Sequence, residues 1–327
     1  MESSSLKLAQ SFLKDAQKAS KGGWFSKPEW DLAAQYLDKA ATAFKAARHY
    51  EEAAGCYAQA SDAYVQINAV YLAAKCYENA ATLADTQLKD HEKAIAYYSR
   101  ASDLYRSQGA AADKAAEMME SAAKACEDID TNRTIQLYDN ALSIYENEDR
   151  GRFGVETFKR TIRYLLDKGR LSEAVDIQMR LSAVCERVNN RFELNKSNLS
   201  AIIMLLAFGD SVEAGKKLDE FGQDVTFIRS KEAAAAEQLV QAYSDGDQDE
   251  YARIAGDHPV TSLDTAIARV AAKTRIPGAR RVEPRAANSA AVAVTGLSAS
   301  GKQQGAFNGN IAATEVQDND DDDDDLL

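Results

Sequence analysis

Proline is almost absent from the middle of this chain. Only four of its 327 residues are proline, and none lies between Pro28 and Pro259. The intervening sequence is rich in Ala, Leu, Glu, Lys and Tyr. Folds with many strands need frequent turns, which proline and glycine usually supply, whereas helix interiors exclude proline. The gap therefore predicts continuous helix packing and argues against a β-rich or α/β fold.

Cysteine and histidine are also scarce, which excludes the common metal and disulfide frameworks. The few that exist are far apart in sequence: Cys56, Cys76, Cys126 and Cys185, and His49, His91 and His258. Zinc sites and disulfide frameworks need paired spacings that these positions lack. The cysteines fall in alanine-rich helical patterns, so we predict buried thiols of a reduced, cytosolic protein. No metal and no other cofactor is expected.

Long hydrophobic runs are missing as well. The longest, from Leu199 to Gly209, falls well short of the roughly 18 residues that a membrane span needs. The N-terminal MESSSLKLAQ has neither the basic nor the apolar region of a secretory signal. We therefore expect a cytoplasmic protein without a membrane span.

Positive charge is in short supply overall. The chain has 39 Lys and Arg against 51 Asp and Glu, a net charge of −12, which argues against nucleic acid as a partner. The excess lies at the end of the chain. Residues 286–327 contribute −7, mostly from the run Asp320 to Asp325, and leave −5 for everything before them. The body of the protein is therefore close to neutral.

What the sequence does contain is an internal repeat of about 40 residues. Small residues recur in steps of 41, 40, 40 and 40 at Ala53, Ala94, Thr134, Ala174 and Ala214. Larger residues keep the same step at Tyr57, Tyr98, Tyr138, Gln178 and Leu218, and an interleaved series runs through Tyr36, Tyr77, Met118, Phe158 and Asn198. Two helix families of about 20 residues that alternate five times specify an array of antiparallel helix pairs.

The residue types predict how these helices pack. Alanine lets helices approach closely while a nearby aromatic side chain fills the next groove, as in tetratricopeptide (TPR) repeats. We therefore predict an all-α fold: a TPR-like right-handed superhelical solenoid of about 14 helices. Four glycines fall where helices should end and are expected to terminate them in the left-handed conformation: Gly109, Gly151, Gly169 and Gly209.

The repeat register fades beyond Gly222, which suggests a division into domains. Three shorter helices are expected at 229–243, 247–256 and 261–275, with a break at His258 and Pro259. Residues 1–222 are then the solenoid, and residues 223–276 a small helical bundle that caps it. Residues 277–327 are poor in large apolar groups and are predicted to be a disordered linker and acidic tail.

Two motifs resemble chemical sites, and neither fits its template. The stretch from Gly296 to Gln303 matches a phosphate-binding loop, but Gln303 replaces the hydroxyl residue that holds magnesium, and no strands surround it. Asp245, Asp247 and Asp249 begin like a calcium loop, which then lacks its glycine and its final glutamate. With Glu250 they are better interpreted as an acidic helix corner that could dock a basic partner. We expect no enzymatic activity.

The segment before the second helix contains exposed aromatic candidates. Ser26-Lys-Pro-Glu29 has the pattern of a capping box, which predicts that a helix starts at about Lys27. Phe25 then either pairs with Trp30 as a hydrophobic staple or is exposed with Trp24. Trp24 follows two glycines and lies between lysines, an arrangement that suits the bilayer interface. We favour membrane contact for Trp24 over packing on the first helix.

A basic cluster lies in the fourth and fifth repeats. Lys159 and Arg163 are four residues apart and share a helix face, Arg160 adjoins it, and Lys196 lies one repeat later. Such charges are often no more than a solvated surface. The alternative is a basic face for an acidic helical partner.

Together the 40-residue repeat, the aromatic loop and the acidic tail ending near leucine resemble the soluble NSF attachment proteins. The segments TIQLYDNALSIYENEDRGRF (134–153), RLSEAVDIQMRL (170–181) and AEQLVQAYSDGDQDEY (236–251) are most similar to the gamma branch of that family. The resemblance implies an adaptor that binds SNARE complexes of the syntaxin type on membranes and recruits the hexameric ATPase NSF. It also implies a peripheral location on endomembranes, on vacuolar, Golgi or ER vesicles.

The resemblance implies roles for particular residues. It assigns membrane contact to the loop residues Trp24 and Phe25, and SNARE contact to Arg160 and Lys196. Lys159 and Arg163 of the same basic cluster are expected to contribute to that SNARE contact. It assigns NSF contact to Asp245, Asp247, Asp249, Glu250, Leu326 and Leu327. Glu117 and Glu156 depart from the pattern, since they stand where the alpha branch has lysines. The main rival interpretation is a generic TPR-type scaffold or trafficking adaptor that binds a peptide or helix; a nucleotide-binding enzyme that uses Lys302 is a distant third.

Overall fold

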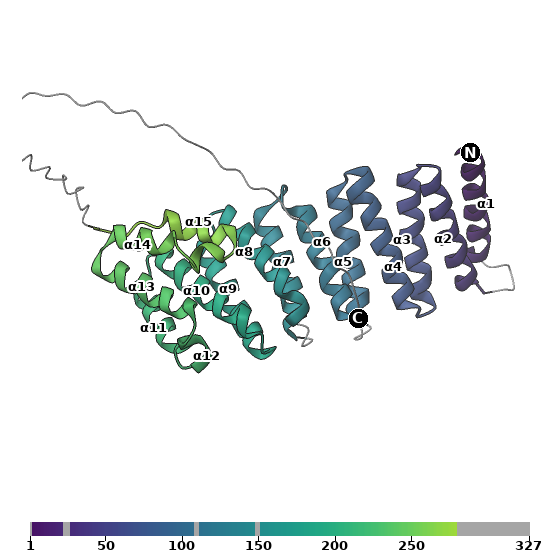
Figure 1. Ribbon diagram of the computed structural model, residues 1–327. Helices are drawn as coiled ribbons and strands as arrows, with labels where there is room; N and C mark the ends of the chain where they lie inside the picture. The colour runs from purple at the N-terminus through teal and green to yellow at the C-terminus, as the bar shows by residue number, and fades with distance from the viewer. Residues whose placement is uncertain (1, 22–26, 108–110, 148–150, 280–327) are drawn as a thin grey trace, which may run out of the picture. The chain divides into compact units, whose positions relative to one another are not determined.

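The computed structural model describes residues 2–21, 27–107, 111–147 and 151–279, and all structural statements concern these ranges. They contain fifteen α-helices, one π-helical turn, one 3-10 turn and no strand. The predicted all-α, TPR-like solenoid is confirmed, with consecutive helices packed as antiparallel neighbours (Figure 1). Residues 1–282 form one compact unit. The predicted division of this unit at residue 222 stays a prediction.

The helices of the repeat array succeed one another in chain order. Their bounds are α1 (Glu2–Lys21), α2 (Trp30–Ala46), α3 (Tyr50–Gln66), α4 (Val70–Leu83), α5 (His91–Ser107), α6 (Ala112–Cys126), α7 (Thr131–Asn147), α8 (Gly151–Asp167), α9 (Leu171–Arg187), α10 (Arg191–Phe208) and α11 (Ser211–Phe221). The π-helical turn η1 (Ala84–Leu88) extends α4.

Shorter helices come after the array: α12 (Val225–Ile228), α13 (Lys231–Asp245), α14 (Gln248–Ala255), the 3-10 turn η2 (Val260–Ser262) and α15 (Thr265–Lys273). The three helices predicted beyond residue 228 are confirmed as α13, α14 and α15. The last begins later than expected because Asp264 caps it, with its carboxylate accepting a hydrogen bond from the backbone N–H of Ala266.

The repeat anchors form the core between neighbouring helices. All five small anchors found in the sequence are fully buried: Ala53, Ala94, Thr134, Ala174 and Ala214. Buried tyrosines fill the grooves beside them, and their hydroxyls donate to acids on the preceding helix. Tyr77 donates to Asp62 at 2.8 Å and Tyr105 to Glu78 at 2.7 Å. A buried phenol needs such a partner, so the tyrosine positions fix both packing and register.

Several turns between helices share one geometry. In each of these turns one residue is left-handed, and the residue after it donates its N–H to a carbonyl five positions back. Examples are Arg48, Asn68, Gly169, Asn189 and Gly209. The prediction is confirmed for Gly169 and Gly209, while Gly109 lies outside the described residues. For Gly151 it is wrong: Gly151 opens α8, and a Cβ there would lie 2.7 Å from a methyl of Val184.

The start of α2 also differs from the expectation. Residues 27–29 are not helical, and α2 begins at Trp30, with Glu29 at the N-cap and no side-chain capping bond. The backbone N–H of Glu29 donates instead to the carbonyl of Ala19 at 2.9 Å, which ties the entering chain to the end of α1. This non-local bond displaces the helix start predicted at about Lys27.

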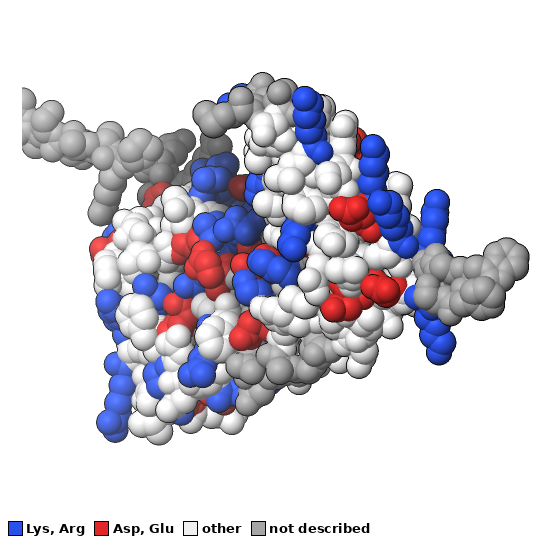
Figure 2. Space-filling view, turned by 90° about the vertical axis from the view of Figure 1, so that its right-hand side faces the viewer, with Lys and Arg blue, Asp and Glu red and all other residues white. Residues whose placement is uncertain are grey.

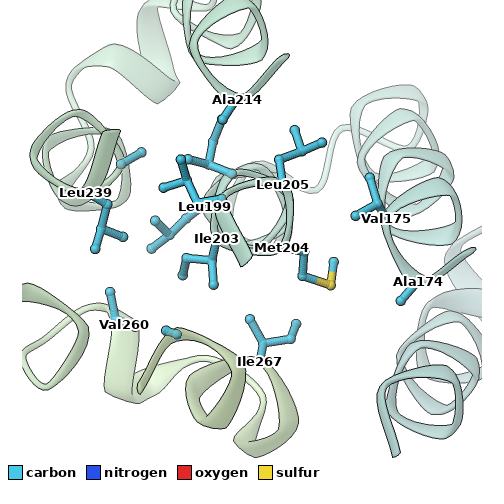
Figure 3. Close-up of a cluster of buried hydrophobic side chains, with 14 of the residues drawn as sticks. Ala174, Val175, Leu199, Ile203, Met204, Leu205, Ala214, Leu239, Val260 and Ile267 are labelled. Carbon is cyan, nitrogen blue, oxygen red and sulfur yellow. The ribbon is translucent and has the colours of Figure 1, made fainter. Parts of the chain in front are cut away.

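The longest apolar run of the sequence lies in α10, which is surrounded by other helices. Leu199, Ile203, Met204 and Leu205 extend from α10 in several directions, toward α9, α11, α13 and the η2–α15 segment (Figure 3). A helix that is apolar all round is buried in a core. None of the described helices combines the length and apolar character that crossing a bilayer requires.

The four cysteines are buried and unpaired, as predicted. Burial raises the pKa of the Cys56 thiol to about 11 and those of Cys76 and Cys185 to about 12. Because the thiolate is the reactive form, these side chains act as small apolar groups of the core.

Candidate partner-binding surfaces

The four basic residues of the predicted SNARE-binding cluster lie on two neighbouring even-numbered helices. Lys159, Arg160 and Arg163 are on α8, and Lys196 is on α10. The even-numbered helices form one of the two helix families of the array, and the segment η2–α15 packs against α8 and α10. The cluster therefore lies beside the last helices of the described chain.

Two of these cations join α8 to its neighbours through ion pairs. The ammonium of Lys159 lies 2.8 Å from Oε1 of Glu193 on α10. The guanidinium of Arg163 lies 2.7 Å from Glu156 on its own helix and 3.4 Å from Asp264, the cap of α15. These pairs hold α8, α10 and α15 in register, so the residues have a structural role whether or not a partner binds.

Arg160 faces the other way along the array, toward α6. Its Nε lies 3.3 Å from Oε1 of Glu120, and the ammonium of Lys124 lies 2.6 Å from the same oxygen. The hydroxyl of Thr157 donates a 2.6 Å hydrogen bond to the other carboxylate oxygen, Oε2. Burial alone would raise the pKa of Glu120, but the hydrogen bonds from Lys124 and Thr157 and the two cations lower it below its ordinary value. Glu120 is thus a charged link between α6 and α8.

Lys159 and Lys196 both line a cavity of about 250 Å³. Its walls come from α8, α9, α10 and the η2–α15 segment. The buried Gln178 of α9 lines it and donates through Nε2 to the carbonyl of Ser197 at 3.2 Å. Gln178 is the repeat position at which earlier repeats have tyrosine, so here a polar network replaces an aromatic ring.

Two exposed phenylalanines near the cluster escaped the sequence reasoning. Phe153 is 50% exposed in the first turn of α8, and Phe192 is 65% exposed in the first turn of α10. The guanidinium carbon of Arg152 lies 5.0 Å from the Phe153 ring centre, and the ammonium of Lys196 lies 4.4 Å from that of Phe192. Exposed aromatic rings stacked with cations are typical of protein interfaces. Their nearly one-repeat spacing was the signal available in the sequence.

The odd-numbered helices carry a different charge pattern, a ladder of ion pairs between repeats. Lys93 on α5 pairs with Glu51 on α3 at 2.7 Å, and Arg133 on α7 pairs with Glu92 on α5 at 2.7 Å. Arg180 on α9 continues the ladder toward α7, where it pairs with Asp139 and, at 2.6 Å, with Glu146. The partners are 34 to 42 residues apart, so each rung links equivalent helices.

Charges of both signs are therefore interleaved over much of the array. Lys and Arg side chains alternate with Asp and Glu across the middle of the face in Figure 2. A partner protein that binds this surface therefore contacts cations and carboxylates side by side, and not a surface that carries charge of one sign.

The acidic residues assigned to NSF contact lie together at the corner between α13 and α14. Asp245 accepts a hydrogen bond from Gln241 at 2.8 Å, and Asp247 caps α14 by accepting from the backbone N–H of Glu250 at 2.9 Å. Glu250 pairs with Arg253 at 2.7 Å, and the hydrogen bond from Arg253 lowers the pKa of Glu250. Asp245, Asp247 and Asp249 are exposed. These residues therefore form an acidic corner between the two helices, and its docking of a basic partner stays a prediction.

Several predicted residues fall outside the described ranges. These are the loop residues Trp24 and Phe25, the terminal Leu326 and Leu327, and the stretch 296–303 that matches a phosphate-binding loop. Within the described ranges, no group of three or more His, Cys, Asp or Glu side chains is placed to hold a metal ion.

Comparison with known proteins gives a consistent result. The family model described as "Soluble NSF attachment protein, SNAP" matches residues 7–262. A protein of Dictyostelium discoideum named gamma-soluble NSF attachment protein is 35% identical over 263 residues, which cover 80% of this chain and 81% of that protein. An Arabidopsis thaliana protein of the same name is 29% identical over 245 residues, covering 75% of this chain and 84% of that protein. The family match takes in α8, α10 and the acidic corner between α13 and α14, and it ends before Asp264.

Proposed function

The chain belongs to the soluble NSF attachment protein family, and from that membership we propose that it is an adaptor. It binds SNARE complexes on membranes, and it recruits and stimulates the hexameric ATPase NSF, which takes the complexes apart during vesicle transport and membrane fusion. The observation that carries this proposal is the family match over residues 7–262, which takes in nearly the whole helical array. The adaptor itself supplies binding surfaces and leaves the chemistry to NSF.

The SNARE bundle contacts the first turns of α8 and α10. Phe153 and Phe192 supply the apolar contact, and Lys196, stacked on Phe192, supplies a positive charge beside it. Lys159, Arg160 and Arg163 add charges that are already paired with acids. The pair of Arg163 with Glu156 is exposed on both sides and contributes only about 0–1 kcal/mol, so an acidic helix can exchange with Glu156 there.

Glu117 and Glu156 influence which SNARE bundles this surface can bind. In this chain Glu117 pairs with Lys114 at 2.6 Å and Glu156 with Arg163 at 2.7 Å, so each acid neutralises a neighbouring cation. The surface is therefore less basic than one with lysines at these positions. We expect it to select a SNARE bundle that offers apolar groups for the two phenylalanines, with fewer acidic residues opposite α6.

NSF contacts the corner between α13 and α14, near the C-terminal end of the described chain. The corner of Asp245, Asp247, Asp249 and Glu250 presents exposed carboxylates on two short helices. Since several of them are fixed by hydrogen bonds to their own helices, they form a rigid acidic patch for a basic partner. In this proposal Leu326 and Leu327 add a second contact that stimulates ATP hydrolysis.

In this proposal, Trp24 and Phe25 hold the adaptor on the bilayer. The protein is then a cytoplasmic protein that is peripheral to endomembranes. This contact is tested by replacing both residues with serine. NSF-driven disassembly of membrane-anchored SNARE complexes should slow, while disassembly of soluble complexes should keep its rate. Equal loss in the two assays would reject membrane contact by this loop.

The adaptor role itself is tested by recruitment. Immobilised SNARE complexes are incubated with NSF and a non-hydrolysable ATP analogue, with and without the purified chain, and bound NSF is measured. We expect NSF to be retained only when the chain is present. Retention of the chain without NSF would favour a TPR-type scaffold that binds a helical partner, and retention of neither would reject the proposal.

A further inference from the structure

The first helix carries a stripe of lysines on the side that faces away from the array. Lys7, Lys14, Lys18 and Lys21 are all exposed. At 3.6 residues per turn these four positions fall within an arc of about 60° around α1. Ala9 and Ala16, which are buried against the neighbouring helices, lie on the opposite side of the helix. The stripe therefore faces solvent along most of the length of α1.

The stripe is unlike the other charged helix faces of the described chain. On several other helices a lysine pairs with an acid three residues away, as in Lys75–Glu78, Lys114–Glu117 and Lys217–Glu220. On α1 only Lys18 has such a partner, Asp15 at 3.8 Å. Lys7, Lys14 and Lys21 have no acidic partner among the described residues. A terminal helix needs a polar outer face for solubility, but solubility does not require one sign of charge.

The spacing of the unpaired lysines suits a flat surface. Lys7, Lys14 and Lys21 recur every seven residues, which places successive ammonium groups about 10 Å apart on a straight line. No large apolar side chain lies within the stripe; the nearest is Leu8, 51% exposed at its edge. Binding through this face would be shallow, electrostatic and sensitive to salt.

We propose that the lysine stripe of α1 docks on the anionic surface of a lipid bilayer, so that lipid charge strengthens the adaptor's hold on the membrane. The inference deepens the membrane contact of the proposed function and rests on it. It adds a contact separate from the aromatic loop, since the stripe is built from described residues of α1 alone. Each lysine close to an anionic membrane strengthens binding by a factor of about five.

The test compares two charge-matched variants of the full chain. In the first, Lys7→Gln, Lys14→Gln and Lys21→Gln remove the unpaired lysines of the stripe. In the control, Lys168→Gln, Lys216→Gln and Lys273→Gln remove three exposed lysines from other elements. Binding is measured by co-sedimentation with vesicles of phosphatidylcholine alone and with vesicles that also contain phosphatidylserine, over a range of salt concentrations.

We expect wild type and control to bind the phosphatidylserine vesicles more tightly than the neutral ones, with the difference lost at high salt. The stripe variant should bind the anionic vesicles on the order of tenfold to a hundredfold more weakly. Equal weakening of both variants would overturn the proposal, since net charge would then be responsible. Unchanged vesicle binding with weaker binding to soluble SNARE complexes would also overturn it, because the stripe would then face a protein.

A circular dichroism melt of both variants shows that loss of binding is not loss of folding. The proposed function is scored separately, by recruitment of NSF to soluble SNARE complexes without vesicles. If recruitment fails in the wild type while vesicle binding depends on the stripe, the adaptor role is wrong and the lipid contact stands. If recruitment succeeds and the stripe variant binds vesicles normally, only the lipid contact is wrong.

Discussion

The two helix families of the array both carry ion pairs between repeats, yet among the described residues only the even-numbered family also carries exposed aromatic rings. The odd-numbered helices have the ladder from Glu51 to Arg180, in which cation and carboxylate meet one repeat apart. On α8 and α10 similar pairs surround Phe153 and Phe192, which are half exposed or more. In the proposed function, the paired charges of the odd-numbered helices are structural, whereas those near the exposed aromatic rings belong to the SNARE-binding surface.

The largest expected effect is the loss of the two aromatic rings. Replacing Phe153 and Phe192 with serine should weaken SNARE binding by about thirtyfold or more, because central aromatic residues contribute about 2 kcal/mol or more to interfaces. The matched control is Phe208→Ser, at the other end of α10 and 57% exposed. Surface plasmon resonance on immobilised complexes measures both. Equal affinity for the double variant and the control would remove the distinction between the two helix families.

The next effect should appear in stability and leave binding intact. Arg180→Gln removes a cation that is 28% exposed and paired with both Asp139 and Glu146. Hydrogen bonds to Glu146 and Asp139 raise the pKa of this guanidinium despite its burial. We expect the free energy of unfolding to fall by about 1–2 kcal/mol in urea denaturation, with unchanged SNARE affinity.

Arg133→Gln is the matched control for Arg180→Gln, since it removes a ladder cation that is 39% exposed. Its loss should lower stability by at most about 1 kcal/mol. If the Arg180 variant lost SNARE affinity while it remained folded, the odd-numbered helices would also be a recognition surface.

A smaller effect is expected from the charges on the even-numbered helices. Lys196→Glu together with Arg160→Gln should weaken SNARE binding by about fivefold to tenfold, and added salt should reduce the difference. Arg160 is replaced by the neutral Gln and not by Glu, because a second carboxylate beside Glu120 would destabilise the contact between α6 and α8. Pull-down over a salt series is the measurement. Binding that is unchanged at low salt would remove these residues from the interface.

The smallest effect concerns the pH dependence of the link through Glu120. Its pKa in the folded protein is lowered from the ordinary value of 4.5, so its contribution to stability is present above that value and is lost as pH falls through the lowered pKa. Glu120→Gln should make the acid-induced loss of stability shallower by a few tenths to about 1 kcal/mol. Glu117→Gln, on the same helix and 54% exposed, is the control. Identical pH profiles for wild type and Glu120→Gln would contradict this role.

The sequence predicts the array well because its signal is periodic and local. The step of about 40 residues identifies the buried positions at Ala53 and Ala94, and the same phase places the turns at Gly169 and Gly209. It fails where a distant group decides the local structure. The N–H of Glu29 is taken by a carbonyl of α1, and Gly151 is required by the approach of Val184 from α9.

The candidate surfaces are less predictable than the fold. The basic residues of α8 and α10 are evident in the sequence, but their pairing with Glu120, Glu193 and Asp264 depends on how three helices meet. Phe153 and Phe192 look like core residues in a sequence rich in buried aromatic groups. Only the packing places their rings at the surface.

The most direct measurement of the central claim is the rate at which NSF and ATP dissociate a soluble, fluorescently labelled SNARE complex. With the wild-type chain present, the rate should rise well above that of NSF alone, and the Phe153→Ser, Phe192→Ser variant should lose most of this increase. If the wild-type chain gives no increase, while a known attachment protein stimulates the same NSF preparation, the adaptor role proposed for this chain is contradicted.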